Sequence, residues 1–390
     1  MDVHGGEVSA NNELGKSEGY SVTPWQVKGV VDYYKIAKEF GTHLITDEII
    51  EKLQRFSGTN HPLLSRKFFF SHRDFDVVLD AYQNGENFYL YTGRGPSGHV
   101  HMGHLMPWFF TKYLQDTFGS RLLFQITDDE KYLYSQHLSL EEVKKYTYEN
   151  ILDVIAIGFD PKLTRIVTDT RNIQTLYPLY LEISKRITFS TAKAVFGYKP
   201  SSNIGMIGFP AIQAAPCFLP SLIEKKPTRI LIPAAIDQDP YWRVTRDIAE
   251  KMGFYKPAQV HSKFVPSLAM SGKMSSSKPM GAIFTTDNME TIESKIGGAY
   301  TGGQPSVGLQ RMLGGDPDAC PVFWYLSQFF DDGKDSFERS LKCRTGNLLC
   351  GECKSDLVNH TKSFMSDFTK QRDRARNQIS SFLYEENPFG

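Results

Sequence analysis

Phe88-Tyr-Leu-Tyr-Thr-Gly-Arg-Gly-Pro-Ser-Gly-His-Val-His-Met-Gly-His104 has the pattern of a strand, a tight turn and the start of a helix. Residues 88–92 are apolar or β-favouring and predict a buried strand, and the glycines and proline within 93–96 predict a tight turn. The segment from His101 to His104 predicts the first turn of a helix. A turn of this kind that opens into a helix leaves backbone N–H groups free to bind phosphate.

Two histidines stand at the start of this predicted helix. His101 and His104 share one helical face, and Gly103 between them would let a flat ligand approach the backbone. The pair could instead bind a metal, but the usual zinc motif spaces its histidines one residue further apart and has a Glu after the first. Two core histidines are the other alternative, which the glycine and the strand–turn–helix context disfavour. The pattern suits enzymes that bind ATP through a first strand–helix unit.

Length and composition limit the number of domains and the class of protein that the chain can form. The 390 residues predict two or three domains, and 41% hydrophobic with 23% charged residues is ordinary for a soluble globular protein. Lys+Arg and Asp+Glu both number 44, so any RNA contact would need a local basic patch. Five cysteines, few and odd in number, favour a reducing compartment. We see no apolar run of membrane-spanning length and no targeting pattern near the N-terminus, so the expected compartment is the cytosol.

The first 80 residues predict a tail followed by a small accessory segment. Residues 1–19 are polar and predict a disordered tail. Tyr20–Val27 alternates apolar and polar residues and predicts one short edge strand, within an N-terminal segment of helices that spans residues 20–80. In that segment Thr46 predicts the N-cap of a helix that ends at Gly58.

The middle of the chain alternates strands with helices. Further strands are expected at Arg121–Thr127, Arg165–Val167 and Arg229–Pro233, and Ser139 with Glu142 predicts a capping box for a helix. This alternation predicts a doubly wound, parallel, Rossmann-type α/β sheet over residues 81–287. Acidic and amide residues at 128–130 and 237–238, like Gly93, follow strand ends. Because ligands bind at the carboxyl ends of parallel strands, we expect these groups to share one crevice.

Beyond Asp287 the pattern changes. Seven glycines between 297 and 315 mark a loop-rich junction, and helical patterns replace strands, so residues 288–390 predict a helical C-terminal domain. Near its end stand Lys370, Arg372, Arg374 and Arg376, which favour a solvated face over an RNA contact.

A second glycine- and serine-rich loop, Ser271-Gly-Lys-Met-Ser-Ser-Ser-Lys278, completes a motif pair with the histidines. H-x-G-H early and K-M-S-x-S late resembles the signature of class I aminoacyl-tRNA synthetases. The chain is similar, from about Val22 to Asp287, to tryptophanyl-tRNA synthetases of the eukaryotic cytoplasmic or archaeal type. The strings that carry this resemblance, besides residues 91–97, are Thr127-Asp-Asp-Glu-Lys-Tyr132, Pro210-Ala-Ile-Gln-Ala-Ala-Pro216 and Ala235-Ile-Asp-Gln-Asp-Pro-Tyr-Trp-Arg-Val-Thr-Arg-Asp247.

The resemblance implies ATP, Mg²⁺, L-tryptophan and tRNA(Trp) as reactants, a homodimer without membrane contact, a lid over the active site at residues 20–27 and an anticodon-binding role for 288–390. It also implies site residues in three groups. The catalytic group is His101, His104, Lys273 and Arg94; the ATP group is Gly93, Gly95, Gly103, Asp237, Met274, Ser275 and Ser277; the tryptophan group is Tyr91, Gln125, Glu130, Gln213 and Gln238.

The sequence departs from the family pattern at one position, and its cysteines allow one alternative metal site. The second lysine of K-M-S-K-S is Ser276 here, and Lys278 is too far along to be assigned its role. Cys343, Cys350 and Cys353, with Cys320 or His360, could form a zinc site, but only C-x-x-C is well formed and the other spacings match no standard finger. We expect inert thiols and no protein-bound metal.

Three other functions compete with tryptophan activation. A tyrosyl-tRNA synthetase would share the fold and motifs, but the I-Q-A-A-P and A-I-D-Q-D-P-Y strings favour tryptophan. A nucleotidyltransferase that uses H-x-G-H would not need the K-M-S loop or the helical C-terminal domain. A catalytically inactive RNA-binding or signalling paralogue is disfavoured because both histidines and Lys273 are intact.

Overall fold

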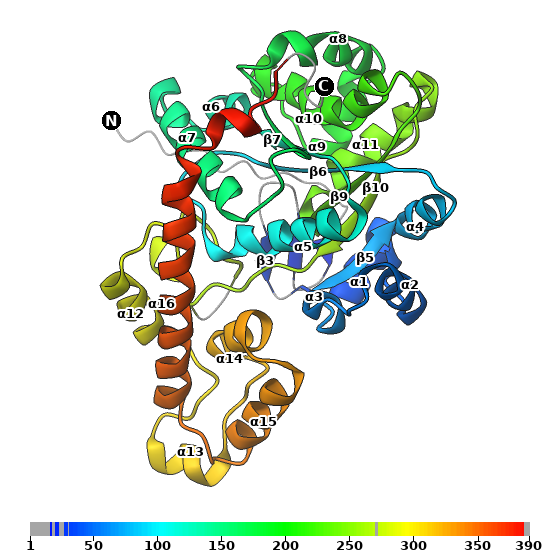
Figure 1. Ribbon diagram of the computed structural model, residues 1–390. Helices are drawn as coiled ribbons and strands as arrows, with labels where there is room; N and C mark the ends of the chain where they lie inside the picture. Colours follow the sequence, from blue (N-terminus) through cyan, green and yellow to red (C-terminus); the bar gives the residue numbers. More distant parts are fainter. Residues whose placement is uncertain (1–15, 18–19, 23–26, 30, 270–271, 386–390) are drawn as a thin grey trace.

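Figure 1 shows the computed structural model, which describes residues 16–17, 20–22, 27–29, 31–269 and 272–385. A seven-stranded sheet lies at its centre, in the order β4-β5-β10-β9-β6-β7-β8. The strands from β10 to β8 are parallel, whereas β5 pairs antiparallel with β10 and β4 with β5. Their bounds are β4 His43–Leu44, β5 Phe69–Arg73, β6 Phe88–Arg94, β7 Leu122–Ile126, β8 Thr164–Thr168, β9 Arg229–Ala235 and β10 Ala258–Ser262.

The strand order creates the crevice. From β6 the chain moves outward through β7 to β8, then returns to place β9 on the other side of β6, so direction reverses between β6 and β9. The doubly wound sheet expected from the sequence is therefore confirmed, with the strands predicted near 88, 121, 165 and 229. The sequence analysis predicted no strand at the positions of β4, β5 and β10. The first strand is also longer than predicted: it runs to Arg94, so Gly93 belongs to β6 and not to the turn.

Helices cover both faces of the sheet and form two large apolar cores with it, while a smaller cluster lies around α1. One core packs α2 to α5, α7 and parts of the C-terminal helices against the sheet, and the other packs α8 to α11 against the opposite face. The helices before residue 288 are α1 Tyr33–Phe40, α2 Asp47–Ser57, α3 Pro62–Ser65, α4 Phe75–Gln83, α5 Met102–Phe118, α6 Asp128–Tyr134, α7 Leu140–Ala156, α8 Ile173–Ser184, α9 Phe189–Phe196, α10 Ile204–Ile223 and α11 Asp239–Ala249.

The predicted helix ends are confirmed where the capping residues were readable. The Thr46 hydroxyl accepts the N–H of Ile49 at 3.4 Å, and α2 stops at Gly58 in the left-handed conformation that favours glycine. Ser139 and Glu142 form the predicted capping box of α7. Local rules therefore placed both helices to within a residue or two.

Residues 288–385 contain helices and no strand, as expected. Figure 1 shows the long α16 running along one side of the molecule, with α13, α14 and α15 gathered near its first turns. Leu357 and Phe368 of α16 share a continuous apolar core with Leu152 of α7, so these helices pack directly on the catalytic sheet's layer. The helices are α12 Met289–Gly297, α13 Val307–Leu313, α14 Pro321–Tyr325, α15 Gly333–Arg344, α16 Cys350–Ala375 and α17 Ile379–Phe382. A domain boundary at 288 stays a prediction.

Arg372 departs from its predicted role. It was grouped with residues on a solvated face, but its guanidinium turns inward, where Nε donates to Asp153 at 2.7 Å and Nη2 donates to Glu149 at 2.5 Å. Only 11% of its side chain is exposed. Because Glu149 and Asp153 belong to α7, Arg372 fastens α16 to the catalytic layer. Lys370, Arg374 and Arg376 do lie on the exposed surface.

The N-terminal segment differs from the single strand predicted over 20–27. Described residues there form a three-stranded antiparallel sheet of β1 Lys16–Ser17, β2 Tyr20–Val22 and β3 Val27–Gly29. The tail was predicted over 1–19; residues 16–17 form β1 instead, and residues 1–15 and 18–19 lie outside the described residues, as do residues 23–26 of the lid predicted over 20–27.

The apolar helix α10 corrects one expectation from the sequence. By length and composition α10 could cross a membrane, contrary to our statement that no run approaches that length. However, 72% of its apolar window is buried, where the helix packs in the core formed with α8, α9 and α11. A buried core helix passes the same test, so α10 carries no argument for a membrane.

Candidate active site

A cavity of about 990 Å³ opens at the carboxyl ends of the parallel strands, beside the reversal between β6 and β9. Such a position is the usual ligand site of an open α/β sheet. All of the residues assigned from the sequence line this one cavity: Tyr91, Gly93, Arg94, Gly95, His101, Gly103, His104, Gln125, Glu130, Gln213, Asp237, Gln238, Lys273, Met274, Ser275 and Ser277. Lys278 is not among the described residues that line the cavity. The individual roles stay predictions.

The two histidines stack at the N-terminus of α5. His101 is the N-cap, one position before the helical turn in which we expected it, and His104 is the third helical residue. Their ring centroids are 3.6 Å apart, and Nδ1 of His104 accepts the backbone N–H of His101 at 3.2 Å. Burial, reinforced by the charge of Arg94, holds the pKa of both rings well below the usual range. A neutral His104 whose Nδ1 accepts must carry its proton on Nε2, where it can donate.

Arg94, the last residue of β6, presents an unused donor to the cavity. Its Nε donates to Asn150 at 3.1 Å, but its buried Nη2 has no hydrogen-bond partner among the described residues. Burial lowers the pKa of Arg94 to about 10, against an opposing contribution from Glu130, so the group remains cationic at neutral pH. A buried cation with a spare N–H suits an anionic ligand. Beside it, a Cβ on Gly95 would overlap the end of the Lys131 side chain, which would have to move.

Lys273 reaches across the cavity from the K-M-S loop. Its Nζ lies 2.9 Å from Oδ2 of Asp237 and 5.1 Å from the centroid of the Phe264 ring. The loop lysine and the carboxylate that follows β9 therefore form an ion pair. The sequence had suggested contacts from Asp237 to a ribose or an ammonium group and did not suggest this ion pair.

Met274, the next residue, seats the loop on its surroundings. Its Sδ accepts the backbone N–H of Gly103 at 3.4 Å, and the hydroxyl of Tyr325 lies 3.8 Å from the same sulfur. Gly103 belongs to the first turn of α5, and Tyr325 is the last residue of α14. On the exposed side, the hydroxyls of Ser275 and Ser277 are 2.9 Å apart. The loop is therefore held by its methionine, while its serines remain near the opening.

Tyr91 and Gln125 form the innermost polar group. The Tyr91 hydroxyl lies within hydrogen-bonding distance of Oε1 of Gln125 and 2.9 Å from the backbone carbonyl of Gln213. Nε2 of Gln125 donates to Asp169 at 2.7 Å, which turns the amide carbonyl towards Tyr91. The edge of Trp242 packs on the Tyr91 ring at 5.4 Å. Both the hydroxyl and the amide oxygen keep lone pairs for a ligand N–H.

Asp169, which sequence reasoning missed, sets the direction of that amide. It follows β8 and is 1% exposed. Burial raises the pKa of Asp169 well above its usual range, and the neighbouring Asp129 raises it further. We therefore treat Asp169 as a neutral carboxylic acid. The signal was available: a carboxylate soon after the predicted strand Arg165–Val167 should reach the same edge of the sheet as Gln125.

The acidic run after β7 divides between two tasks. Glu130 lines the cavity, where Oε1 pairs with Lys131 at 2.6 Å. Asp128 instead accepts the backbone N–H of Thr170 at 3.0 Å and does not line the cavity. Our expectation that the whole run shares the crevice was wrong because it forms the first turn of α6, in which successive side chains point in different directions.

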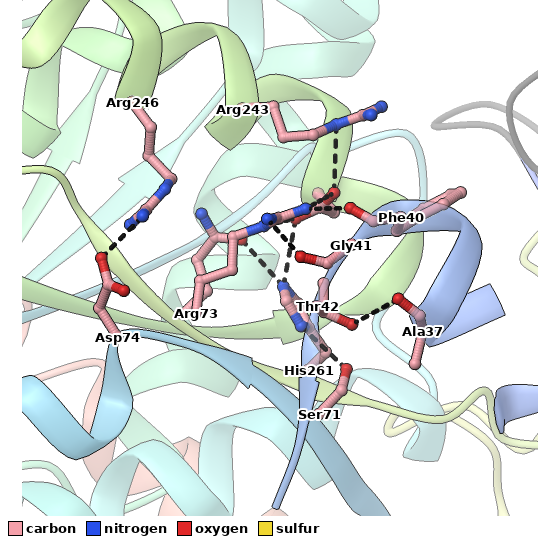
Figure 2. A network of polar contacts seen from close by, with 12 residues as sticks. Ala37, Phe40, Gly41, Thr42, Ser71, Arg73, Asp74, Arg243, Arg246 and His261 are labelled. Atoms are coloured by element: carbon pink, nitrogen blue, oxygen red, sulfur yellow. Dashed lines mark hydrogen bonds and ion pairs between the residues drawn. The ribbon is translucent and has the colours of Figure 1, made fainter.

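A buried charge network around Asp239 anchors the turn at 237–238. Figure 2 labels three of its members, Arg73, Arg243 and His261. Arg73 of β5 donates to both carboxylate oxygens of Asp239, at 2.7 and 3.0 Å. Arg243 approaches the same carboxylate at 3.2 Å, and His261 of β10 lies 3.6 Å away. Fixing Asp239 fixes the turn before it, from which Gln238 faces the cavity. None of this network was predicted, because it is assembled from strands that the sequence analysis missed.

Comparisons with known proteins agree with this geometry. The family model described as tRNA synthetases class I (W and Y) matches residues 83–366, and the chain belongs to that family. It is 52% identical over 371 residues to the tryptophan–tRNA ligase of Pyrococcus abyssi, with 94% of each chain covered. The solved tryptophanyl-tRNA synthetase of Plasmodium falciparum superposes with a TM-score of 0.86 at 38% identity, covering 92% of this chain and 98% of that one. A tryptophan-bound tryptophanyl-tRNA synthetase from Encephalitozoon cuniculi gives 0.83 at 37% identity, over 92% and 99%.

Proposed function

We propose that this protein is a tryptophan–tRNA ligase, which activates L-tryptophan with ATP and transfers it to tRNA(Trp). The observation that carries the proposal is the oriented Tyr91–Gln125 pair at the inner wall of a cavity that also holds the H-x-G-H and K-M-S residues. An indole offers a single N–H donor, and this pair offers oxygen acceptors whose direction is set by Asp169. The curated relatives carry the same activity in their names.

The first step joins the tryptophan carboxylate to ATP. One carboxylate oxygen forms a bond to the α-phosphorus as the bond from that phosphorus to the bridging oxygen breaks, and pyrophosphate leaves with the electron pair. The nucleophile is already an anion, so no catalytic base is needed, and the protein's contribution is positioning and charge stabilisation. In the second step a ribose hydroxyl at the tRNA 3′ end attacks the carbonyl carbon and AMP leaves.

Four side chains would supply the charge and donors in that first step. Nε2–H of His104 would donate to a phosphate oxygen, with His101 stacked against it, and the spare N–H of Arg94 would add a cationic contact. Lys273 would leave Asp237 for the departing pyrophosphate. Gly93, Gly95 and Gly103 would let ATP approach the backbone, as Met274, Ser275 and Ser277 close the loop over it.

The amino acid's polar end would meet the other cavity groups. Glu130, Gln213 and Gln238 would bind its ammonium and carboxylate, and Nε2 of Gln213 already approaches Oε1 of Gln238 at 3.4 Å. Mg²⁺ would travel with ATP. The phosphate oxygens of ATP would be the main ligands for the ion, with few contributed by the protein.

We propose a homodimer on the strength of one exposed apolar surface. Tyr177 and Leu181 of α8 and Ile204 of α10 are 50%, 49% and 88% exposed, on helices that pack side by side. A second copy of the chain is the occupant that the family resemblance implies. Sedimentation at micromolar concentration should give twice the 44.3 kDa chain mass, and Ile204→Arg should shift the protein towards monomer. A wild-type monomer would contradict the dimer.

The remaining partner is tRNA, which we propose to meet the C-terminal helices α12–α17 at its anticodon, in the cytosol. The exposed Lys370, Arg374 and Arg376 are candidate backbone contacts. No position for the nucleic acid follows from net charge alone.

The deciding experiment is amino-acid-dependent pyrophosphate exchange measured across all twenty amino acids, followed by charging of tRNA(Trp). Exchange with tryptophan alone is the expected result. Exchange with tyrosine would favour the neighbouring synthetase, and exchange with no amino acid would favour an inactive paralogue or a nucleotidyltransferase.

A further inference from the structure

A lysine outside the predicted site residues also lines the active-site cavity. Lys263 follows Ser262, the last residue of β10, and reaches the cavity from the carboxyl end of that strand. Its backbone N–H donates to the carbonyl of Phe68 at 2.9 Å, so the main chain here is held independently of the side chain. Because ligands of an open α/β sheet bind at the carboxyl ends of its parallel strands, Lys263 starts from a position where it can meet one.

Lys263 differs from the other cavity lysines in having no counter-ion. Lys131 and Lys273 are each paired with a carboxylate, at 2.6 and 2.9 Å. Among the described residues, no carboxylate lies within ion-pairing distance of Lys263, whose side chain is half-buried. Burial lowers the pKa of Lys263, and the neighbouring Lys67 lowers it further. A half-buried ammonium without a counter-ion is stabilised when an anionic ligand binds beside it.

An aromatic pair connects Lys263 with Lys273. Nζ of Lys263 lies 5.4 Å from the centroid of the Tyr33 ring, and Nζ of Lys273 lies 5.1 Å from that of Phe264. The two ring centroids are 6.2 Å apart, and the Tyr33 hydroxyl accepts the backbone N–H of Phe264 at 3.0 Å. Burial raises the pKa of Tyr33, and Asp237, the partner of Lys273, contributes to the rise. The two ammonium groups therefore flank one aromatic pair, on the side of the cavity that the K-M-S loop borders.

The K-M-S loop itself brings one lysine to this side. Ser276 lines the cavity, and its Cβ lies 3.8 Å from the point where a Cβ on Gly98 would stand. Position 276 therefore faces the turn before the histidines but carries no charge. Lys278 is not among the described lining residues. A triphosphate spreads its negative charge over three phosphate groups, so a cation besides Lys273 would find an anionic partner here.

We propose that Lys263 binds the β- and γ-phosphates of ATP, as the cation that the K-M-S loop lacks at position 276. This assignment rests on the proposed ligase function, which makes ATP the ligand. Lys263 needs no rearrangement of an existing ion pair to bind a phosphate, whereas Lys273 must first leave Asp237. Lys263 is therefore a contact of the bound ATP before reaction, and its loss should weaken ATP binding more than it slows the chemical step.

The first test titrates ATP and Mg²⁺ into the full-length protein without tryptophan, so that no adenylate forms, and repeats the titration with AMP. Lys263→Met keeps an unbranched side chain over the Tyr33 ring and removes the charge. Its ATP affinity should fall by about tenfold or more, the order of one charge-assisted contact, while its AMP affinity stays within about twofold of wild type. Equal losses for ATP and AMP, or an unchanged ATP affinity, overturn the proposal.

Two further variants separate a direct contact from a general effect of charge. Lys263→Arg keeps the cation and should retain ATP affinity within about threefold of wild type. Lys67→Ala is the matched control, because it removes an exposed lysine near Lys263 that is not among the lining residues, and its ATP affinity should equal that of wild type. A loss in Lys67→Ala as large as that in Lys263→Met would contradict a direct contact.

A compensating substitution tests the relation to the loop. Ser276→Lys, introduced into Lys263→Met, should restore most of the lost ATP affinity, because it returns a cation to the same side of the cavity. The single Ser276→Lys variant completes the double-mutant cycle, from which the interaction between the two positions is obtained. Equal losses with and without Ser276→Lys would contradict a shared ligand for the two positions.

Pyrophosphate exchange with tryptophan keeps this assignment distinct from the ligase function. Wild-type protein without exchange would refute the ligase function, while the ATP and AMP titrations would still report whether Lys263 binds the triphosphate. In an active enzyme, Lys263→Met should raise KM for ATP by about tenfold and leave KM for tryptophan unchanged. A raised KM for tryptophan with an unchanged KM for ATP overturns the proposal.

Discussion

The ammonium of Lys273 lies 2.9 Å from the carboxylate of Asp237, across the cavity that the K-M-S loop borders. The pair joins the loop to the turn after β9, so the loop lysine is already drawn towards the site before a nucleotide arrives. When ATP binds, the phosphates must compete with Asp237 for the same cation.

Lys273→Ala should lower the rate of tryptophan activation by about 10²-fold, the order expected when a charge contact made in the transition state is lost. Tryptophan affinity should barely change, because the lysine faces the phosphate side. Rapid kinetics of adenylate formation measures the rate. Lys278→Ala is the control: its side chain is exposed and lies outside the cavity, so its rate should stay near wild type. Unchanged activation in Lys273→Ala would mean that its role is wrongly assigned.

Gln125→Ala should reduce kcat/KM for tryptophan by roughly tenfold or more, the cost of one buried hydrogen bond. The loss should be smaller for an analogue whose ring nitrogen is replaced by sulfur, because that analogue offers no N–H. Steady-state pyrophosphate exchange with the two substrates makes the comparison. Equal losses for both would show that Gln125 supports the fold and does not read the indole.

Asp169 should act through Gln125, and a neutral Asp169 carboxyl predicts different effects for two substitutions at this position. Asp169→Asn keeps an acceptor for Gln125 and resembles the neutral acid, so kcat/KM for tryptophan should stay within about threefold of wild type. Asp169→Ala frees the amide to turn and should lose about tenfold for tryptophan but less for the sulfur analogue. If Asn were as damaging as Ala, the carboxylate would have to be charged in the native protein.

His261 predicts a pH dependence of stability. Burial lowers its pKa from 6.5 to about 4, against the opposing field of Asp239. Below about pH 6.5 the unfolded chain takes up a proton that the folded chain refuses, so this residue's contribution falls as pH drops towards 4, by about 3 kcal/mol in all.

The measurement is the difference in unfolding free energy between wild type and His261→Gln, from urea titrations at several pH values. Taking the difference between wild type and variant cancels the contributions of groups whose pH dependence has the opposite sign. Asp153 is such a group, because burial raises the pKa of its carboxyl to about 6. Wild type should lose more stability than the variant between pH 6.5 and 4. Parallel curves would contradict the buried neutral state of His261.

Residues close together in the sequence were the predictable ones. The strand–turn–helix at 88–104, the caps at Thr46 and Ser139, and the parallel sheet follow from local chemistry and period, and the structure confirms them. The rule that ligands gather at carboxyl ends also placed the cavity, although Asp128 shows that a shared strand end does not ensure a shared direction.

What escaped prediction depends on pairing between distant segments. The Arg73–Asp239 contact joins residues 166 positions apart, through an antiparallel edge strand with no distinctive pattern of its own. The inward turn of Arg372 depends on two carboxylates of α7. The cavity shared by Cys320, Cys343, Cys350 and Cys353 depends on how the ends of α14, α15 and α16 meet. In each case the sequence could suggest the chemistry of a residue but not which distant residue it would contact.

The seat of Met274 has a thermodynamic consequence. Its sulfur touches both Gly103, at the nucleotide end of α5, and Tyr325, which ends the five-residue helix that Cys320 begins. If closing the loop on ATP shifts α14, whatever binds the far end of that helix must alter ATP affinity, and ATP must alter that binding by the same factor. Tyr325→Phe, which removes only the hydroxyl, should weaken this coupling, measured as a change in ATP affinity relative to wild type. The surroundings of Gly103 and of Tyr325, which lie far apart in the sequence, would then respond to the same equilibrium.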